Sequence, residues 1–117
     1  MKSSYIVILI ITFFVSGSTA ISQTLSGTQE YGNGGEYEGE FLDGLPHGMG
    51  TYKLPNGYRY IGEWFEGRIE GQGEALFSSG SVYVGSFVNG EPEGSGKITF
   101  SDGGTYEGEW ANGSITG

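Results

Sequence analysis

One five-residue pattern recurs along the chain at a fixed interval of 23 residues. It consists of a tyrosine, a variable residue, a glycine, a second variable residue and an aromatic residue. Its four copies occupy residues 37–41, 60–64, 83–87 and 106–110. A fixed period of this size is typical of a repeat array, in which each unit buries its apolar face only against its neighbours. The repeat therefore constrains the fold more than any other feature of the sequence.

Within each copy, the tyrosine, glycine and aromatic residue stand two positions apart. This period of two puts them on one face of a β-strand, and the intervening positions on the other. The intervening positions are mostly acidic or polar, which is typical of a strand with one solvated face. They hold Glu38, Glu40, Glu63, Ser86, Glu107 and Glu109, with Ile61 and Val84 as exceptions.

A second strand is expected in each unit, shorter than the first, with apolar residues such as Tyr52 and Leu54 two apart. Asp43-Gly44 separates the two strands of one unit, and Asn56-Gly57 separates that unit from the next. Such dipeptides are strong signals for tight β-turns. We therefore predict an all-β fold, an elongated single-layer antiparallel meander of β-hairpin repeats.

The aromatic positions form one row across the predicted sheet. The row consists of Tyr37, Phe41, Tyr60, Trp64, Tyr83, Phe87, Tyr106 and Trp110. One interpretation is that these rings form the core by packing on each other, with glycines such as Gly62 making room for them. The other is that part of the row stays open as a candidate binding face for a sugar, a peptide, a lipid or a second copy, because a single layer leaves it uncovered.

The pattern resembles the membrane occupation and recognition nexus (MORN) repeat. Residues 60–67 and the Gly71-Gln72-Gly73 segment are similar to its consensus, and the resemblance covers residues 27–117. It implies an elongated, twisted sheet of hairpins. It also implies a link to membrane association and self-association, as in junctional membrane proteins, lipid kinases and scaffold proteins that carry such repeats. The resemblance specifies the fold closely and the function only broadly.

The first 20 residues are typical of a secretory signal peptide, expected to be helical. Lys2 precedes an apolar run over residues 6–15, and small residues lead to a cleavage site after Ala20. The alternative is a retained membrane anchor, but the run is shorter than the roughly 17–25 residues that span a bilayer. The chain has no cysteine, so an exported domain would be stabilised by packing without disulfides. We expect a periplasmic or extracellular protein.

These features divide the chain into a signal peptide (1–20), a short linker (21–26) and a repeat domain (27–117). The repeat domain begins with half a unit (27–36), continues with three full units (37–59, 60–82 and 83–105) and ends with the opposite half (106–117). The two end strands are complementary halves of one repeat. Pairing them between molecules would complete a unit, so we expect head-to-tail or dimeric self-association by strand addition.

The charge of the chain argues against several partners. Without Lys2, four cationic side chains remain against 14 carboxylates, a formal net charge of −10. Nucleic acid requires a basic surface and is excluded. Anionic lipid is repelled, although weak contact with a membrane stays open.

The sequence offers no recognisable catalytic, cofactor or metal site. His47 is the one histidine, expected in an exposed loop without a catalytic partner, and a lone histidine without cysteine cannot hold zinc. The repeated carboxylates fit a solvated face better than a divalent-cation or catalytic site. The Gly-x-Gly segments lack the following helix that a phosphate site requires.

We therefore predict a non-catalytic exported scaffold or interaction module that binds a protein partner or itself. The alternative is a peripheral membrane protein of the cell envelope that contacts phospholipid.

Overall fold

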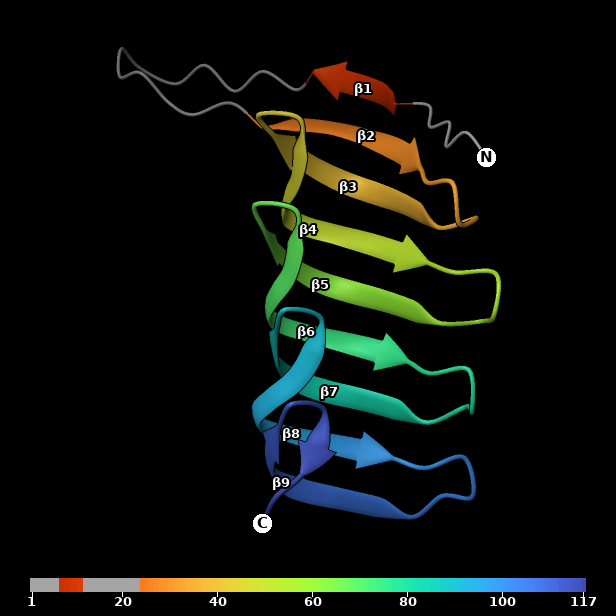
Figure 1. Cartoon of the computed structure of the whole chain (residues 1–117), viewed down its shortest axis with the longest axis vertical. Coiled ribbons are helices and arrows are strands. Elements are labelled where there is room, and N and C mark those ends of the chain that lie inside the picture. Colours follow the sequence, from red (N-terminus) through yellow and green to blue (C-terminus); the bar gives the residue numbers. More distant parts are fainter. Residues whose placement is uncertain (1–6, 12–23) are drawn as a thin grey trace.

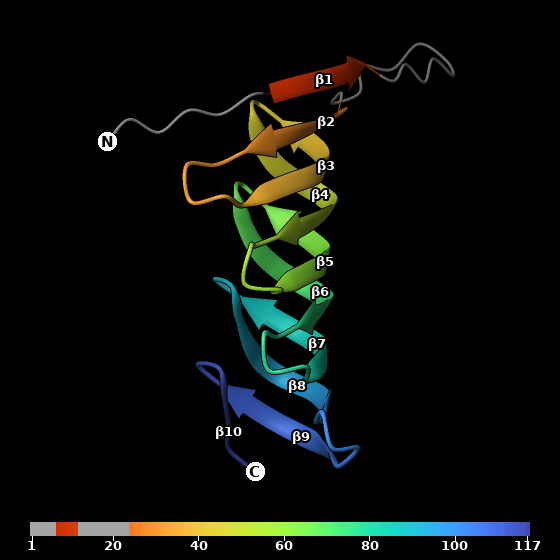
Figure 2. The same cartoon turned by 90° about the vertical axis from the view of Figure 1, so that its right-hand side faces the viewer.

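In the computed structural model, residues 7–11 and 24–117 are described, with side chains from residue 24 onward. These residues form one antiparallel sheet in which every strand pairs with its sequence neighbours (Figure 1). The strands are β1 (Val7–Ile11), β2 (Leu25–Glu30), β3 (Glu36–Leu42), β4 (Leu45–Lys53), β5 (Arg59–Phe65), β6 (Arg68–Leu76), β7 (Val82–Val88), β8 (Glu91–Thr99), β9 (Thr105–Ala111) and β10 (Ser114–Ile115). The prediction of an all-β meander is confirmed. The strands stack in sequence order along the long axis of the molecule (Figure 2).

The helix expected in the leader is not seen in the five leader residues that the structure describes. Val7–Ile11 form strand β1 and pair with β2, with Leu9 opposite Gly27. Valine and isoleucine favour strands, and this pairing satisfies backbone groups on an otherwise open edge of β2. Residues 1–6 and 12–23 lie outside the described part of the chain, so the signal peptide and its cleavage remain predictions.

Tight two-residue turns join the strands of each hairpin, as predicted. Asp43 and Gly44 have φ angles of 53° and 80°, and Asn89 and Gly90 have φ angles of 50° and 82°. Two successive positive φ angles define a type I′ turn, whose twist matches that of the flanking strands. Glu66 adopts the same conformation, with a φ of 49°, although glutamate is not a preferred residue there.

In the three full units the second strand of the hairpin is longer than the first, so the prediction of a shorter strand was wrong. β4, β6 and β8 each contain nine residues, whereas β3, β5, β7 and β9 contain seven. The extra length arises at a bulge. In the first hairpin, Gly39 pairs with Gly50, but Phe41 pairs with Pro46, so β4 has three residues where β3 has one. Such an excess bends the longer strand.

Glycine and an acidic side chain together stabilise the bulge. Gly48 has a φ of 93°, which favours glycine. Glu40 Oε1 accepts a hydrogen bond from Met49 N at 2.6 Å. Glu63 Oε1 accepts one from Gln72 N at the same distance in the next hairpin. The sequence predicted only that these two carboxylates face water. They also accept hydrogen bonds from backbone N–H groups that have lost their strand partners at the bulge.

The bend carries the tip of each hairpin out of the plane of the main sheet (Figure 1). Successive tips then bond to each other. Gly67 N donates to Pro46 O at 2.8 Å, and Gly90 N donates to Ile69 O at 3.0 Å. Ile69 packs against the aromatic core, and Pro46 is buried. The hairpin tips therefore cover the aromatic face of the sheet. The sequence led us to expect a single layer that leaves this face uncovered, so the covering tips were not anticipated.

A row of glycines crosses eight strands beneath the aromatic rings. Each glycine pairs directly with the next, in the order Gly27, Gly39, Gly50, Gly62, Gly73, Gly85, Gly96 and Gly108. A Cβ atom at Gly73 would overlap Cε1 of Tyr60, and one at Gly62 would lie 2.5 Å from the Cα atom of Gly73. The glycine row therefore lets the tyrosine rings lie against the backbone, as predicted for Gly62.

We expect Gly73→Ala to lower the free energy of unfolding by about 1–3 kcal/mol, because the new methyl group overlaps the buried ring of Tyr60. Urea denaturation followed by circular dichroism measures this change. The control is Glu74→Ala on the exposed face of the same strand, which should shift the free energy by less than about 0.5 kcal/mol. Equal effects of the two substitutions would mean that the faces are assigned incorrectly.

Candidate functional site

The eight aromatic residues of the predicted binding face lie on one side of the sheet, and seven of them are buried. Tyr37, Tyr60 and Tyr83 have no exposed surface, and the indole residues Trp64 and Trp110 are each 7% exposed. Phe41 and Phe87 are also buried, whereas Tyr106 is half-buried. Burial assigns most of this row to packing within the protein.

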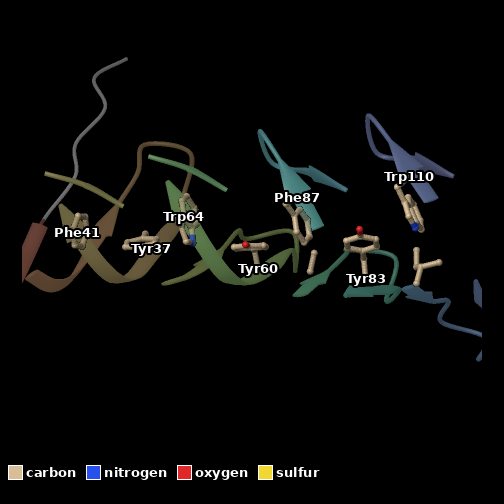
Figure 3. Packing of buried hydrophobic residues seen from close by; sticks show 9 residues of the cluster. Tyr37, Phe41, Tyr60, Trp64, Tyr83, Phe87 and Trp110 are labelled. Atoms are coloured by element: carbon tan, nitrogen blue, oxygen red, sulfur yellow. The ribbon is translucent and has the colours of Figure 1, made fainter. Parts of the chain in front are cut away.

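The rings form one continuous edge-to-face chain, and Figure 3 labels all of its members except Tyr106. Its order is Phe41, Tyr37, Trp64, Tyr60, Phe87, Tyr83, Trp110 and Tyr106. Consecutive ring centroids are 4.9–6.0 Å apart, with interplanar angles of 69–90°. Each such contact contributes about 0.5–1.5 kcal/mol beyond the area that it buries. We call this set the ring row.

The tyrosine hydroxyls satisfy carbonyl groups at the bulges. Tyr37 donates to Glu40 O at 2.6 Å, Tyr60 to Glu63 O at 2.8 Å, and Tyr83 to Ser86 O at 3.0 Å. These carbonyls lie where the ladder shifts register, so the hydroxyl replaces a missing strand partner. This requirement explains why the first position of each copy is tyrosine rather than phenylalanine.

The same surroundings change the acidity of these hydroxyls. Burial raises the pKa of Tyr37 well above its usual value, and the nearby negative charge of Glu40 raises it further. Burial also raises the pKa of Tyr60, and the negative charge of the nearby Glu63 raises it further. Burial also raises the pKa of Tyr83. All three are neutral donors at physiological pH.

Tyr106 differs from the other tyrosines of the ring row. Its hydroxyl oxygen is buried and has no hydrogen-bond partner within the described residues. The carbonyl of Glu109, which corresponds to the acceptors in the other units, instead accepts from Thr116 N at 2.9 Å. This end of the row therefore lacks the internal bonding that the other units have.

An open groove lies beside the ring row. Its volume is about 360 Å³. It is lined by Tyr31, Tyr52, Trp64, Gly67, Arg68, Ile69, Asn89 and Gly90. Of these residues, only Trp64 belongs to the predicted binding face. The sequence signal that could have located the groove is Tyr52, because the equivalent position holds alanine or isoleucine in the next two units.

His47 lies in strand β4 and is half-buried, so its assignment to an exposed loop was wrong. Its Nδ1 accepts a hydrogen bond from Glu66 N in the next turn at 3.2 Å. Glu93, in the same repeat position, accepts from Asn112 N at 2.9 Å. This repeat position therefore links successive hairpin tips. In the unit between them (residues 60–82), the same position holds Glu70, which instead forms an ion pair with Arg68 at 3.3 Å.

Across residues 24–117, the carboxylates do not converge on a candidate metal site, since no group of three or more potential ligands comes together. Among the described residues, no helix is long and apolar enough to cross a membrane.

The MORN repeat family model matches residues 37–57, 60–82, 83–105 and 106–117. The chain belongs to the MORN repeat family. Its matched segments begin at the tyrosines of the ring row, and the resemblance noted from the sequence is thereby confirmed. A comparison with curated proteins finds no match. Modules of this family generally mediate protein or membrane interactions, which agrees with a non-catalytic scaffold.

We expect Tyr60→Phe to lower the free energy of unfolding by about 1–2 kcal/mol, because a buried carbonyl loses its donor while the ring contacts remain. Tyr106→Phe is the matched control. Its hydroxyl has no partner in the described structure, so its removal should change stability by less than about 0.5 kcal/mol. Thermal and urea denaturation of both variants test this difference, and equal losses would contradict the proposed role of the hydroxyls.

Stability should also fall as the pH rises above 10. An unfolded tyrosine releases its proton near pH 10, whereas folded Tyr37, Tyr60 and Tyr83 retain theirs to higher pH. The folded state then binds more protons, and each tyrosine removes up to about 1.4 kcal/mol of stability per pH unit. Urea denaturation over this range measures the slope. Tyr60→Phe should make it shallower, and a slope that stays at zero would refute the assignment.

Proposed function

We propose that this MORN repeat protein is a non-catalytic exported scaffold that binds a protein partner or a second copy of itself. The observation that carries the proposal is the open edge of β9. Within the described residues, β10 pairs with Trp110 and Ala111, and no described strand pairs with residues 105–108 of β9 on that side, although the carbonyl of Gly117 lies close to Gly108. An edge with unpaired backbone groups is a template for strand addition.

The second strand in this proposal is β2. Inside the chain, hairpin strands meet through paired glycines, such as Gly39 with Gly50. Placing Gly108 of one copy opposite Gly27 of another would continue the glycine row across the junction. The same register would place Tyr106 against a strand of the second copy. The association is therefore head-to-tail.

Strand β1 occupies the outer edge of β2, with Leu9 opposite Gly27. A second copy can pair there only after β1 has left. We therefore link association to export, with removal of the leader near Ala20 freeing the β2 edge. The mature protein would then act in the periplasm or outside the cell.

The burial of the ring row limits how it contributes to binding. Seven rings contact other parts of the chain, so we place recognition at the open edges and at Tyr106, with the remaining rings supporting them. The other seven rings are buried, and they contribute to binding only by packing the sheet into the shape that presents its edges. These rings are Tyr37, Phe41, Tyr60, Trp64, Tyr83, Phe87 and Trp110.

A second candidate function is peripheral association with membranes. Exposed apolar side chains lie along the hairpin tips, with Leu45 47%, Phe65 46% and Val88 42% exposed. Such side chains favour contact with a lipid interface. The negative charge of the chain opposes anionic lipid, so neutral lipid fits better. Sedimentation with neutral and with anionic vesicles tests this alternative, and the absence of pelleting with both would remove it.

We expect the chain that begins at Ile21 to associate, and the association to strengthen with salt because screening weakens the repulsion between acidic molecules. Light scattering at low and high salt measures the mass. The uncleaved chain is the matched control, and it should associate less because β1 covers the β2 edge. A strict monomer at high protein concentration and high salt would contradict the proposal.

A further inference from the structure

The groove beside the ring row combines aromatic walls with a polar rim. Tyr52 lines it between two other rings, with its ring centroid 5.9 Å from those of both Tyr31 and Trp64. The interplanar angles are 71° and 73°, so the three rings present surfaces in different directions. Tyr31 and Tyr52 are only half-buried. Part of both rings is therefore available to a ligand.

The rim supplies hydrogen-bonding groups from two hairpins. Arg68 lies at the start of β6, and Asn89 lies in the turn between β7 and β8. Both residues are exposed and line the groove. The Arg68 guanidinium pairs with Glu70 at 3.3 Å, which offsets its charge while leaving other N–H donors. An apolar wall with a few polar groups is the usual composition of a small-molecule site.

The groups that line the groove discriminate between ligand classes. The indole N–H of Trp64 is not available to the carbonyl groups of a proline-rich peptide, because it already donates to Gly50 O at 3.2 Å. Among the described residues that line the groove, Arg68 alone is charged, so the lining holds no carboxylate to pair with a basic peptide. The acidic character of the whole chain disfavours an anion. A neutral ligand with several hydroxyl groups satisfies all three conditions.

We propose that this groove binds a neutral saccharide. The apolar C–H face of a sugar ring packs on Tyr52 and Tyr31, since an aromatic face provides a large apolar surface at a fixed angle. The sugar hydroxyls bond with Arg68 and Asn89 at the rim. The site occurs in one place in the array, because the positions equivalent to Tyr52 hold Ala75 and Ile98. This activity is independent of strand addition at β2 and β9.

Tryptophan fluorescence provides a direct test. The chain has two tryptophans, so Trp110→Phe leaves Trp64 at the groove as the only one. We expect chitotetraose or cellotetraose to change its emission saturably, and tetragalacturonate, an anionic counterpart, to bind at least about tenfold more weakly. Isothermal titration calorimetry on the unmodified chain repeats the measurement without the substitution.

Matched variants locate the site. Tyr31→Ala should weaken saccharide binding by about tenfold or more, which is a large effect for one contact. Phe100→Ala is the control, since Phe100 occupies the same repeat position three units later and lies outside the groove lining. Arg68→Gln should weaken binding severalfold without changing the melting temperature, because Arg68 is exposed. Circular dichroism verifies that each variant is folded.

Three results would overturn the proposal. The first is the absence of a saturable response to both neutral oligosaccharides. The second is an equal affinity in folded Tyr31→Ala and Phe100→Ala. The third is preferential binding of a proline-rich peptide at the groove. None of these results bears on light scattering of the cleaved chain, so a failure here is distinguishable from a failure of the scaffold function.

Discussion

The whole sheet depends on the close approach of tyrosine rings to backbone that has no side chains. In each full unit, the tyrosine ring lies over the glycine of the neighbouring strand, where even a methyl group would overlap it. The hydroxyl at the end of the ring then reaches the carbonyl exposed by the bulge, as from Tyr60 to Glu63. The tyrosine side chain thus fills the core, contacts two strands and donates a hydrogen bond to a carbonyl group at the bulge. Glycine reduces intrinsic strand stability by about 0.5–1 kcal/mol relative to alanine, and this packing compensates for that loss.

Much of this arrangement was predictable because it repeats. The period of two fixed the faces of the strands, Asp43-Gly44 and its equivalents fixed the turns, and the uniform glycine positions indicated that the rings need space. The bulge was not predictable, because it depends on how many residues of β4 fit opposite β3. The covering tips were missed for the same reason. They require the contact of Gly67 with Pro46, which belongs to the neighbouring hairpin and leaves no pattern within a single unit.

The candidate site was only partly predictable. The rings of the ring row share one face of the sheet, as the period of two predicted, but their regularity is a property of packing, since a position that is aromatic in every unit serves every unit equally. The groove lies where the repeat is broken, at Tyr52 and Tyr31. Departures from the consensus are thus the informative positions in such an array. Arg68 and Asn89 could not be assigned to the groove from sequence, because they come from different hairpins that the bend brings together.

The contacts of the ring row also have a direction. The hydroxyls of Tyr37, Tyr60 and Tyr83 each bond within their own hairpin, whereas their rings pack against the indole or phenyl group of the following hairpin, as Tyr37 does with Trp64 at 4.9 Å. A finished hairpin therefore offers a prepared surface to the segment that is synthesised next. Each hairpin therefore depends on the next one to cover its tyrosine ring, so a partly formed array leaves one such ring uncovered at its C-terminal end.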